Sequence, residues 1–74
     1  SAADIAANKR PAYQQRVVAE CNELSEKIEK LQAFFDTDNF KSLLADEQRR
    51  LLAQIDAMRY YCACLNSRIE AFAA

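Results

Sequence analysis

The sequence predicts an all-α fold: an antiparallel two-helix hairpin of the coiled-coil type that assembles into a homo-oligomeric helical bundle. The 74 residues include no glycine and one proline, so the chain lacks the turn residues that a hairpin-rich β protein needs. Hydrophobic residues make up 51% of the chain, and many of the polar residues are strong helix formers. Two long segments also repeat their apolar residues with a heptad period, which is typical of packed helices.

The first long helix is expected over about residues 11–36. Its apolar positions alternate between spacings of four and three, which indicates a left-handed seam against a partner helix. Pro11 suits the first turn, where a helix leaves its backbone N–H groups without a partner. The seam consists of Val17, Cys21, Leu24, Ile28, Leu31 and Phe35.

The second long helix is expected over about residues 46–73. Pairing Phe35 with Leu51 and Val17 with Ile69 places an apolar residue opposite every residue of the first seam, so this antiparallel register is preferred. The second seam has the same period and consists of Leu51, Ile55, Met58, Cys62, Leu65, Ile69 and Phe72.

A turn or short helix over residues 37–45 is expected to join the two long helices. Thr37 or Asp38 is expected to cap it, and Asp46 to cap the second long helix, because short polar side chains accept the free N–H groups of a first turn. Residues 1–10 are expected to form either a tail or a short separate helix that carries Ile5. The hairpin domain thus covers residues 11–74.

Apolar residues outside the seams predict self-association. A helical hairpin of this length is seldom stable without a third surface, and bulky side chains beside a seam widen the face that must be covered. A dimer that forms a four-helix bundle is the simplest solution, and a higher symmetric oligomer is the alternative. These residues are Val18, Phe34, Leu44, Leu52, Tyr60, Tyr61 and Cys64.

Charge and cysteine content narrow the range of partners. The formal net charge of −1 provides no basic field to hold duplex nucleic acid. No apolar run approaches the about 18 residues of a membrane span, so no membrane partner is expected. Three cysteines, an odd number, fit a reducing compartment better than a disulfide framework, and the cytoplasm is the expected location.

Residue types also argue against catalysis, metal binding and a cofactor. The chain has no histidine to activate a nucleophile or to complete a zinc site. Cys62 and Cys64 are two residues apart, so on a helix they point in different directions. A chain without glycine has no glycine-rich phosphate loop. We therefore expect no enzyme, no catalytic residue, no metal site and no cofactor.

Polar residues beside the seams form the candidate site. In the expected register, Lys27 lies near Tyr61 and Glu20 lies near Arg68. The plainer interpretation, which the sequence favours, is an ion pair and an amphipathic lid over the core. The alternative is a binding site for an anionic ligand that carries an aromatic ring, since Lys and Arg bind phosphate and a tyrosine face stacks on a base. The candidate ligand-binding residues are Tyr13, Arg16, Lys27, Lys30, Tyr61 and Arg68.

Two segments, YQQRVVAECNELSEKIEKLQAFF and DEQRRLLAQIDAMRYYCACLNSRI, carry a resemblance to a known family. They resemble a group of short bacteriophage helical-hairpin proteins related to a small crAss-like-phage protein, and the resemblance covers about residues 13–70. Cys21 departs from the pattern, where a polar residue is expected, and so does the longer N-terminal tail. The residues that match the group are Gln14 or Gln15, Arg16, Val17, Glu23, Leu24, Lys27 and Leu31, then Met58, Tyr61, Leu65, Arg68 and Ile69.

This resemblance implies a phage accessory protein in the cytoplasm of the host cell. A looser analogy leads to the phage sponge proteins that counter CBASS and Thoeris immunity, which are small helical hairpins that hold cyclic nucleotide signals without cleaving them. The Gly-Tyr-Arg segment typical of those sponges is absent here. The analogy implies sequestration of a cyclic nucleotide-type immune signal. The alternative is a non-catalytic interaction or structural module that binds a host or phage protein.

Overall fold

The computed structural model describes residues 10–73, which fold into three helices. The first long helix, α2, spans Ala12–Phe34, and the second, α4, spans Ala45–Phe72. A short helix, α3, spans Asp38–Lys41 between them. The described residues contain no strand, which confirms the predicted all-α class. Of the expected N-terminal tail or helix, residues 1–9 lie outside the described part of the chain.

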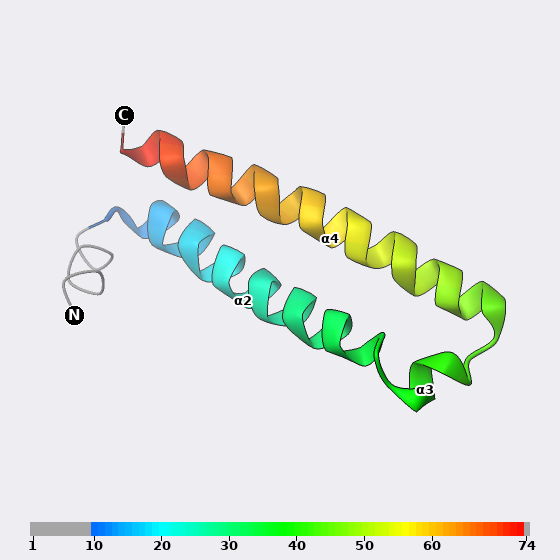
Figure 1. The fold of residues 1–74 in the computed structure, drawn as a ribbon. Coiled ribbons are helices and arrows are strands. Elements are labelled where there is room, and N and C mark those ends of the chain that lie inside the picture. Colours follow the sequence, from blue (N-terminus) through cyan, green and yellow to red (C-terminus); the bar gives the residue numbers. More distant parts are fainter. Residues whose placement is uncertain (1–9, 74) are drawn as a thin grey trace.

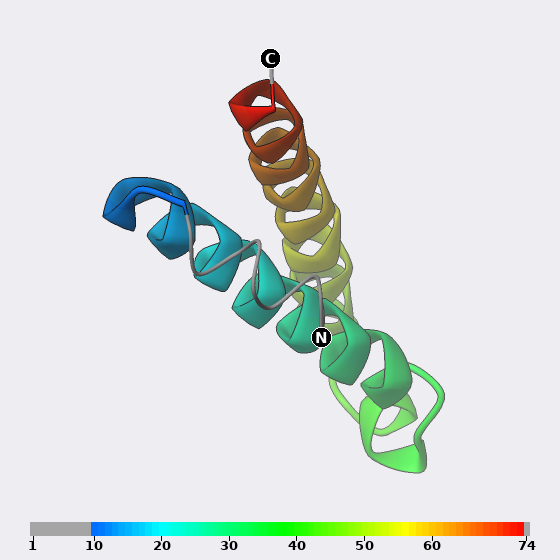
Figure 2. The same cartoon turned by 90° about the vertical axis from the view of Figure 1, so that its left-hand side faces the viewer.

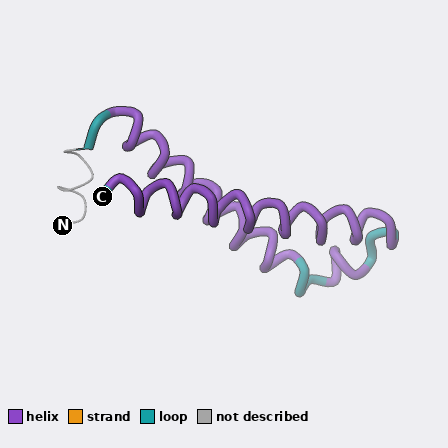
Figure 3. The backbone as a smooth tube through the Cα atoms, turned by 90° about the horizontal axis from the view of Figure 1, so that it is seen from above, coloured by secondary structure: helices purple, strands orange, loops and turns teal. Residues whose placement is uncertain are grey.

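The two long helices lie side by side and run in opposite directions, with α3 at the end where the chain turns (Figure 1). Their axes cross, so that the start of α2 lies apart from the end of α4 when the molecule is turned (Figure 2). The view from above shows the same crossing (Figure 3). The tertiary contacts of the chain are therefore concentrated between α2 and α4.

The seam residues form the core. Val17, Cys21 and Leu65 make one buried cluster, and Leu24, Cys62, Ile69 and Phe72 pack against it. All seven belong to the two heptad seams, and Cys21 and Leu65 are partners in the expected register. Ile55 is buried as well, at 2% exposure.

The connection between α2 and α4 is held in place by the N-cap of α3 and by the side chain of one glutamine. The Thr37 hydroxyl accepts a hydrogen bond from the backbone N–H of Phe40 at 3.2 Å, so Thr37 is the cap of α3. The Gln48 side chain donates to the carbonyl oxygens of Phe40, Lys41 and Leu43 at 3.1–3.2 Å. This single side chain ties the connection to the first turns of α4.

Aromatic rings and cap positions complete this end of the molecule. Phe40 packs edge-on against Phe34 and Phe35, with ring centroids 5.9 and 4.9 Å apart. The long helix α4 begins one residue earlier than expected. Its N-cap is Leu44, whose side chain makes no cap hydrogen bond, and Asp46 lies in the first turn. Asp46 therefore acts on the positive end of the helix dipole as a first-turn acid, without capping it.

The molecule is much more extended than a typical domain of its size. Its Cα radius of gyration is 16.0 Å. A compact chain of this length would have a radius of gyration of about 11 Å. Among residues 10–73, only Val17, Cys21, Ile55 and Leu65 are buried. A pair of crossed helices therefore leaves most of its apolar side chains at least partly in contact with solvent.

Candidate functional site

One flank of the α2–α4 seam brings Lys27 and Tyr61 together. They line a groove of about 200 Å³ with Glu20, Glu23 and Leu24, which we call the Lys27–Tyr61 groove. Leu24 packs against the core cluster and provides an apolar floor. The polar residues around it combine one cation, two carboxylates and one phenol, contributed by both long helices.

A hydrogen bond across the helices orients the Tyr61 side chain. The Tyr61 hydroxyl donates to Glu20 Oε2. This hydrogen bond raises the pKa of Tyr61, and desolvation and the negative charge of Glu20 raise it further, whereas the positive charge of Arg68 lowers it. Tyr61 remains 47% exposed, so its hydroxyl is held while much of the residue stays accessible to a ligand.

The raised pKa of Tyr61 can be tested by titration. Tyr61 is expected to ionise at higher pH than in a Glu20→Ala variant, because removing the carboxylate removes both the acceptor and the repelling charge. A tyrosine pKa that is higher in the folded than in the unfolded state stabilises the fold below about pH 10, and this contribution is lost as pH rises through the folded value. Ultraviolet absorbance of tyrosinate, with Tyr61→Phe used to assign the transition, measures the shift.

The matched control is Glu23→Ala, which removes the other carboxylate of the groove while leaving the acceptor of Tyr61 in place. It is expected to shift the Tyr61 titration less than Glu20→Ala does. Equal shifts for the two variants would contradict the assignment of the hydrogen bond.

Arg68 lies near this groove without lining it. Its charge acts on the Tyr61 hydroxyl, but the ion pair expected between Arg68 and Glu20 is not formed. The ion pairs recorded within residues 10–73 are Arg49–Asp46 and Arg50–Glu47, both in the first turns of α4. The Glu20 carboxylate accepts the hydrogen bond from Tyr61 and makes no ion pair with Arg68.

The remaining candidates lie away from the groove. Tyr13 packs edge-on against Phe72 with ring centroids 5.9 Å apart, at the end of the helix pair opposite α3. Fourteen residues separate it from Lys27 along α2, which corresponds to about 21 Å of helix. Arg16 and Lys30 are exposed and line neither groove described here. The structure therefore brings Lys27 and Tyr61 together, with Arg68 close by.

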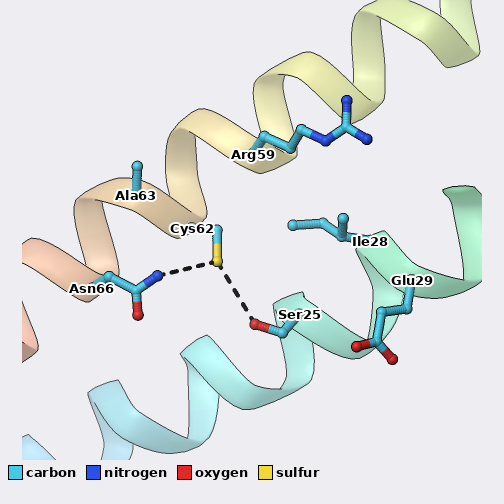
Figure 4. Close-up of a pocket in the computed structure, with 7 residues that line it drawn as sticks. All are labelled: Ser25, Ile28, Glu29, Arg59, Cys62, Ala63 and Asn66. Atoms are coloured by element: carbon cyan, nitrogen blue, oxygen red, sulfur yellow. Dashed lines mark hydrogen bonds between the residues drawn. The ribbon is translucent and has the colours of Figure 1, made fainter.

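The other flank of the seam contains a wider groove of about 400 Å³ (Figure 4). Ile28, Cys62 and Ala63 line it with apolar surface, and four polar residues surround them: Ser25, Glu29, Arg59 and Asn66. None of these polar residues was among the candidates. Ser25, Arg59 and Asn66 each directly follow a seam residue, and this position was the signal that could have found them.

The thiols of Cys21 and Cys62 join a hydrogen-bonded chain between the helices. The Cys21 thiol donates to Asn66 Oδ1 at 3.3 Å, and Asn66 Nδ2 donates to Cys62 Sγ at 3.6 Å. Ser25 Oγ lies 3.7 Å from Cys62 Sγ. Burial raises the pKa of Cys21, the neighbouring Cys62 raises it further, and a hydrogen bond with Ser25 lowers it. Cys21 is thus held as a neutral thiol, which is a poor nucleophile.

The described residues form neither a metal-binding cluster nor a membrane-spanning helix. No group of three or more His, Cys, Asp or Glu side chains within residues 10–73 is arranged to hold a metal ion. None of the helices in that part of the chain has the length and apolar character to cross a membrane.

Comparisons with known proteins identify a family and a relative from a phage. The model of the family described as Sequestin matches residues 11–71. An uncharacterized 7.5 kDa protein from the denB-rIIB intergenic region of Enterobacteria phage T4 is 41% identical over 61 residues, which cover 82% of this chain and 95% of that protein. No solved structure matches.

Proposed function

The chain belongs to the Sequestin family of small phage proteins, and we propose that it binds and sequesters a cyclic nucleotide-type immune signal without cleaving it. The family's name indicates sequestration, and a phage accessory role fits the relative from phage T4. The proposal places the protein in the cytoplasm of the infected cell, where it would lower the free concentration of the signal.

The observation that carries this proposal is the Lys27–Tyr61 groove. Lys27 can pair with a phosphate, and the exposed part of Tyr61 can stack on a base. Glu20 and Glu23 disfavour a bare phosphate in the same groove, but their carboxylates can accept hydrogen bonds from the amino and imino groups of a base. The groove therefore suits a ligand that carries both an anionic group and a hydrogen-bonding ring.

Capture without cleavage is part of the proposal, in line with the family's name, and Tyr61 in particular is not poised for catalysis. Hydrolysis of a phosphodiester requires a group that activates water or stabilises the developing charge. In this groove, Tyr61 is held by Glu20 and its raised pKa keeps the hydroxyl protonated. We propose that the bound signal is released intact and that the protein acts by stoichiometric capture.

Self-association is part of the proposal. One copy offers a shallow groove with a single lysine in its lining, whereas a second copy could cover the ligand and supply further contacts. The exposed apolar side chains outside the seams support an assembly, since Leu44 is 82% exposed and Leu52 is 48% exposed.

Titration calorimetry against cyclic dinucleotides, cyclic trinucleotides and cyclic ADP-ribose isomers tests the proposal. We expect saturable binding of at least one of them, and mass spectrometry of the heat-released ligand should recover it unchanged. Inorganic phosphate serves as the control and is expected to give no saturable heat. The absence of binding to every member of the panel at high micromolar concentration would reject the proposal.

A second candidate function is a helical interaction module that binds a host or phage protein. The exposure of Leu44 and Tyr60, at 82% and 76%, favours it, because exposed apolar side chains often mark contact surfaces. A stoichiometric partner recovered by pull-down would support it if the interaction survives Lys27→Ala and Tyr61→Ala, neither of which alters those two side chains.

A further inference from the structure

Two free thiols lie close together in the α2–α4 seam, on different helices. Cys21 belongs to α2 and is 6% exposed, whereas Cys62 belongs to α4 and is half-buried. Cys62 raises the pKa of Cys21 both by its charge and by a hydrogen bond, so the two side chains interact directly. Neither of them lines the Lys27–Tyr61 groove. The proposed function therefore makes no use of this pair.

The amide of Asn66 binds both thiols and fixes their arrangement. The Cys21 thiol donates to Asn66 Oδ1 at 3.3 Å, which leaves the amide nitrogen to donate to Cys62 Sγ at 3.6 Å. Ser25 Oγ lies 3.7 Å from the same sulfur atom. Figure 4 shows the Cys62 sulfur between Asn66 and Ser25. The position of this sulfur is thus set by side chains from both long helices.

The two thiols differ in their access to a ligand. Cys62 lines the groove of about 400 Å³ together with Ile28 and Ala63, whereas Cys21 is not among the lining residues. Cys21 belongs to the buried cluster behind Cys62. In thiol–disulfide exchange, an accessible thiol forms a mixed disulfide and a neighbouring thiol then resolves it. The arrangement of Cys62 and Cys21 suits these two roles in that order.

Charged residues of the same groove indicate which disulfides suit it. Arg59 provides a cation and Glu29 a carboxylate. Arg59 also donates a hydrogen bond to Gln32 across the two helices, which holds its guanidinium group beside the groove. A guanidinium binds a carboxylate of a ligand, and a carboxylate binds an ammonium group. A small zwitterionic peptide disulfide of the glutathione type carries both of these groups.

We propose that Cys62 and Cys21 form an exchange site for small zwitterionic peptide disulfides, which convert the two thiols into a disulfide that joins α2 to α4. The Cys62 sulfur attacks one sulfur of the bound reagent, and a mixed disulfide forms as the first half of the reagent leaves. The Cys21 sulfur then attacks the Cys62 sulfur and displaces the second half. Each departing thiolate takes up the proton that the attacking thiol loses, and the two electrons from the protein reduce the reagent to two thiols.

Intact-mass spectrometry of a Cys64→Ser protein tests this exchange. The substitution removes the exposed third thiol, which reacts with disulfides without needing a site. Excess oxidised glutathione is expected to lower the mass by two hydrogen atoms and to leave no thiol open to alkylation. Peptide mapping should then recover Cys21 bonded to Cys62. A protein that retains a stable glutathione adduct, or two free thiols, would overturn the proposal.

Two further variants in the Cys64→Ser background separate the roles of the thiols. Cys21→Ser is expected to accumulate the glutathione adduct at Cys62, because no second thiol displaces it. Cys62→Ser is expected to keep Cys21 reduced, because that thiol is buried and neutral. Circular dichroism checks that both variants are helical, and an alanine replaces serine in a variant that is not. Faster formation of an adduct at Cys21 than at Cys62 would contradict the assigned order.

A comparison of two reagents tests the class of ligand. The measured quantity is the rate of reaction with oxidised glutathione divided by the rate with hydroxyethyl disulfide, which is neutral. Arg59→Gln is expected to lower this ratio by about 2- to 5-fold, the range for a partly exposed ion pair. Arg16→Gln is the control, since Arg16 is exposed and lines neither groove. Equal effects of the two variants would overturn the role of Arg59 and of this groove.

Thermal unfolding tests whether the disulfide forms within the native hairpin. A bond between Cys21 and Cys62 closes a long loop through the connection, which lowers the entropy of the unfolded chain. The unfolding midpoint of the oxidised Cys64→Ser protein is therefore expected to rise by about 10 °C or more, and dithiothreitol should reverse this rise. An unchanged or lower midpoint would overturn the link between α2 and α4. None of these measurements involves a nucleotide, so their outcome is independent of the proposed function.

Discussion

Replacing Leu65 by alanine is expected to destabilise the protein by about 2–5 kcal/mol, the largest effect of any single truncation here. Leu65 is 1% exposed and belongs to the buried cluster that joins α2 to α4. Only three other described side chains are buried, so few neighbours can move in to fill the cavity. Because small domains are only marginally stable, we expect Leu65→Ala to be largely unfolded at 37 °C.

Leu44→Ala provides the matched control for this prediction. The same chemical change removes the same atoms, but Leu44 is 82% exposed and makes no cap hydrogen bond with its side chain. Its effect on the free energy of unfolding of the single chain, measured at concentrations too low for self-association, is expected to stay within about 0.5 kcal/mol. Urea unfolding followed by circular dichroism measures both variants. Similar losses of stability would show that the α2–α4 seam is not the core of the protein.

Lys27→Ala is expected to weaken binding of the proposed nucleotide signal by about 10- to 100-fold, which corresponds to the about 1.5–3 kcal/mol of a hydrogen bond to a charged group. Lys27 is the cation that lines the Lys27–Tyr61 groove. It is also exposed, so its loss should leave the fold intact. Calorimetry of the variant with the ligand identified for the wild type gives the change in Kd.

Lys41→Ala is the control for charge alone. Lys41 is an exposed lysine at the end of α3 and is not among the residues that line the groove. It changes the net charge by the same amount as Lys27→Ala, so a loss of affinity caused only by long-range attraction would appear in both variants. An unchanged Kd for Lys27→Ala would exclude the Lys27–Tyr61 groove as the binding site.

The helical class was predictable because its signals are local. A heptad spacing is visible along the chain without knowledge of any partner helix, and Val17, Cys21 and Leu65 are buried where this spacing places them. The absence of glycine and the single proline excluded most alternatives. The membership of a small phage family also agrees with the resemblance carried by the two long segments.

The site was less predictable because its contacts depend on where the terminal polar groups of long side chains lie. The register expected from the sequence placed Glu20 near Arg68. In the structure, the Glu20 carboxylate accepts a hydrogen bond from Tyr61, which lies one heptad before Arg68 along α4. A shift of one heptad is about 10 Å along a helix, and long side chains on crossed helices can cover part of that distance. Heptad positions assign a residue to a flank, but they do not select its partner on that flank.

The sequence by itself therefore determined the helices, their seams and the flank on which Lys27 and Tyr61 lie. The tertiary structure decided which of the six candidate residues meet. It placed Tyr13 against Phe72, left Arg16 and Lys30 outside both grooves, and added Glu23 to the groove of Lys27 and Tyr61. The physical reason is that helix formation and seam burial depend on short-range periodicity. A groove, in contrast, depends on the crossing of two helix axes, which no single segment encodes.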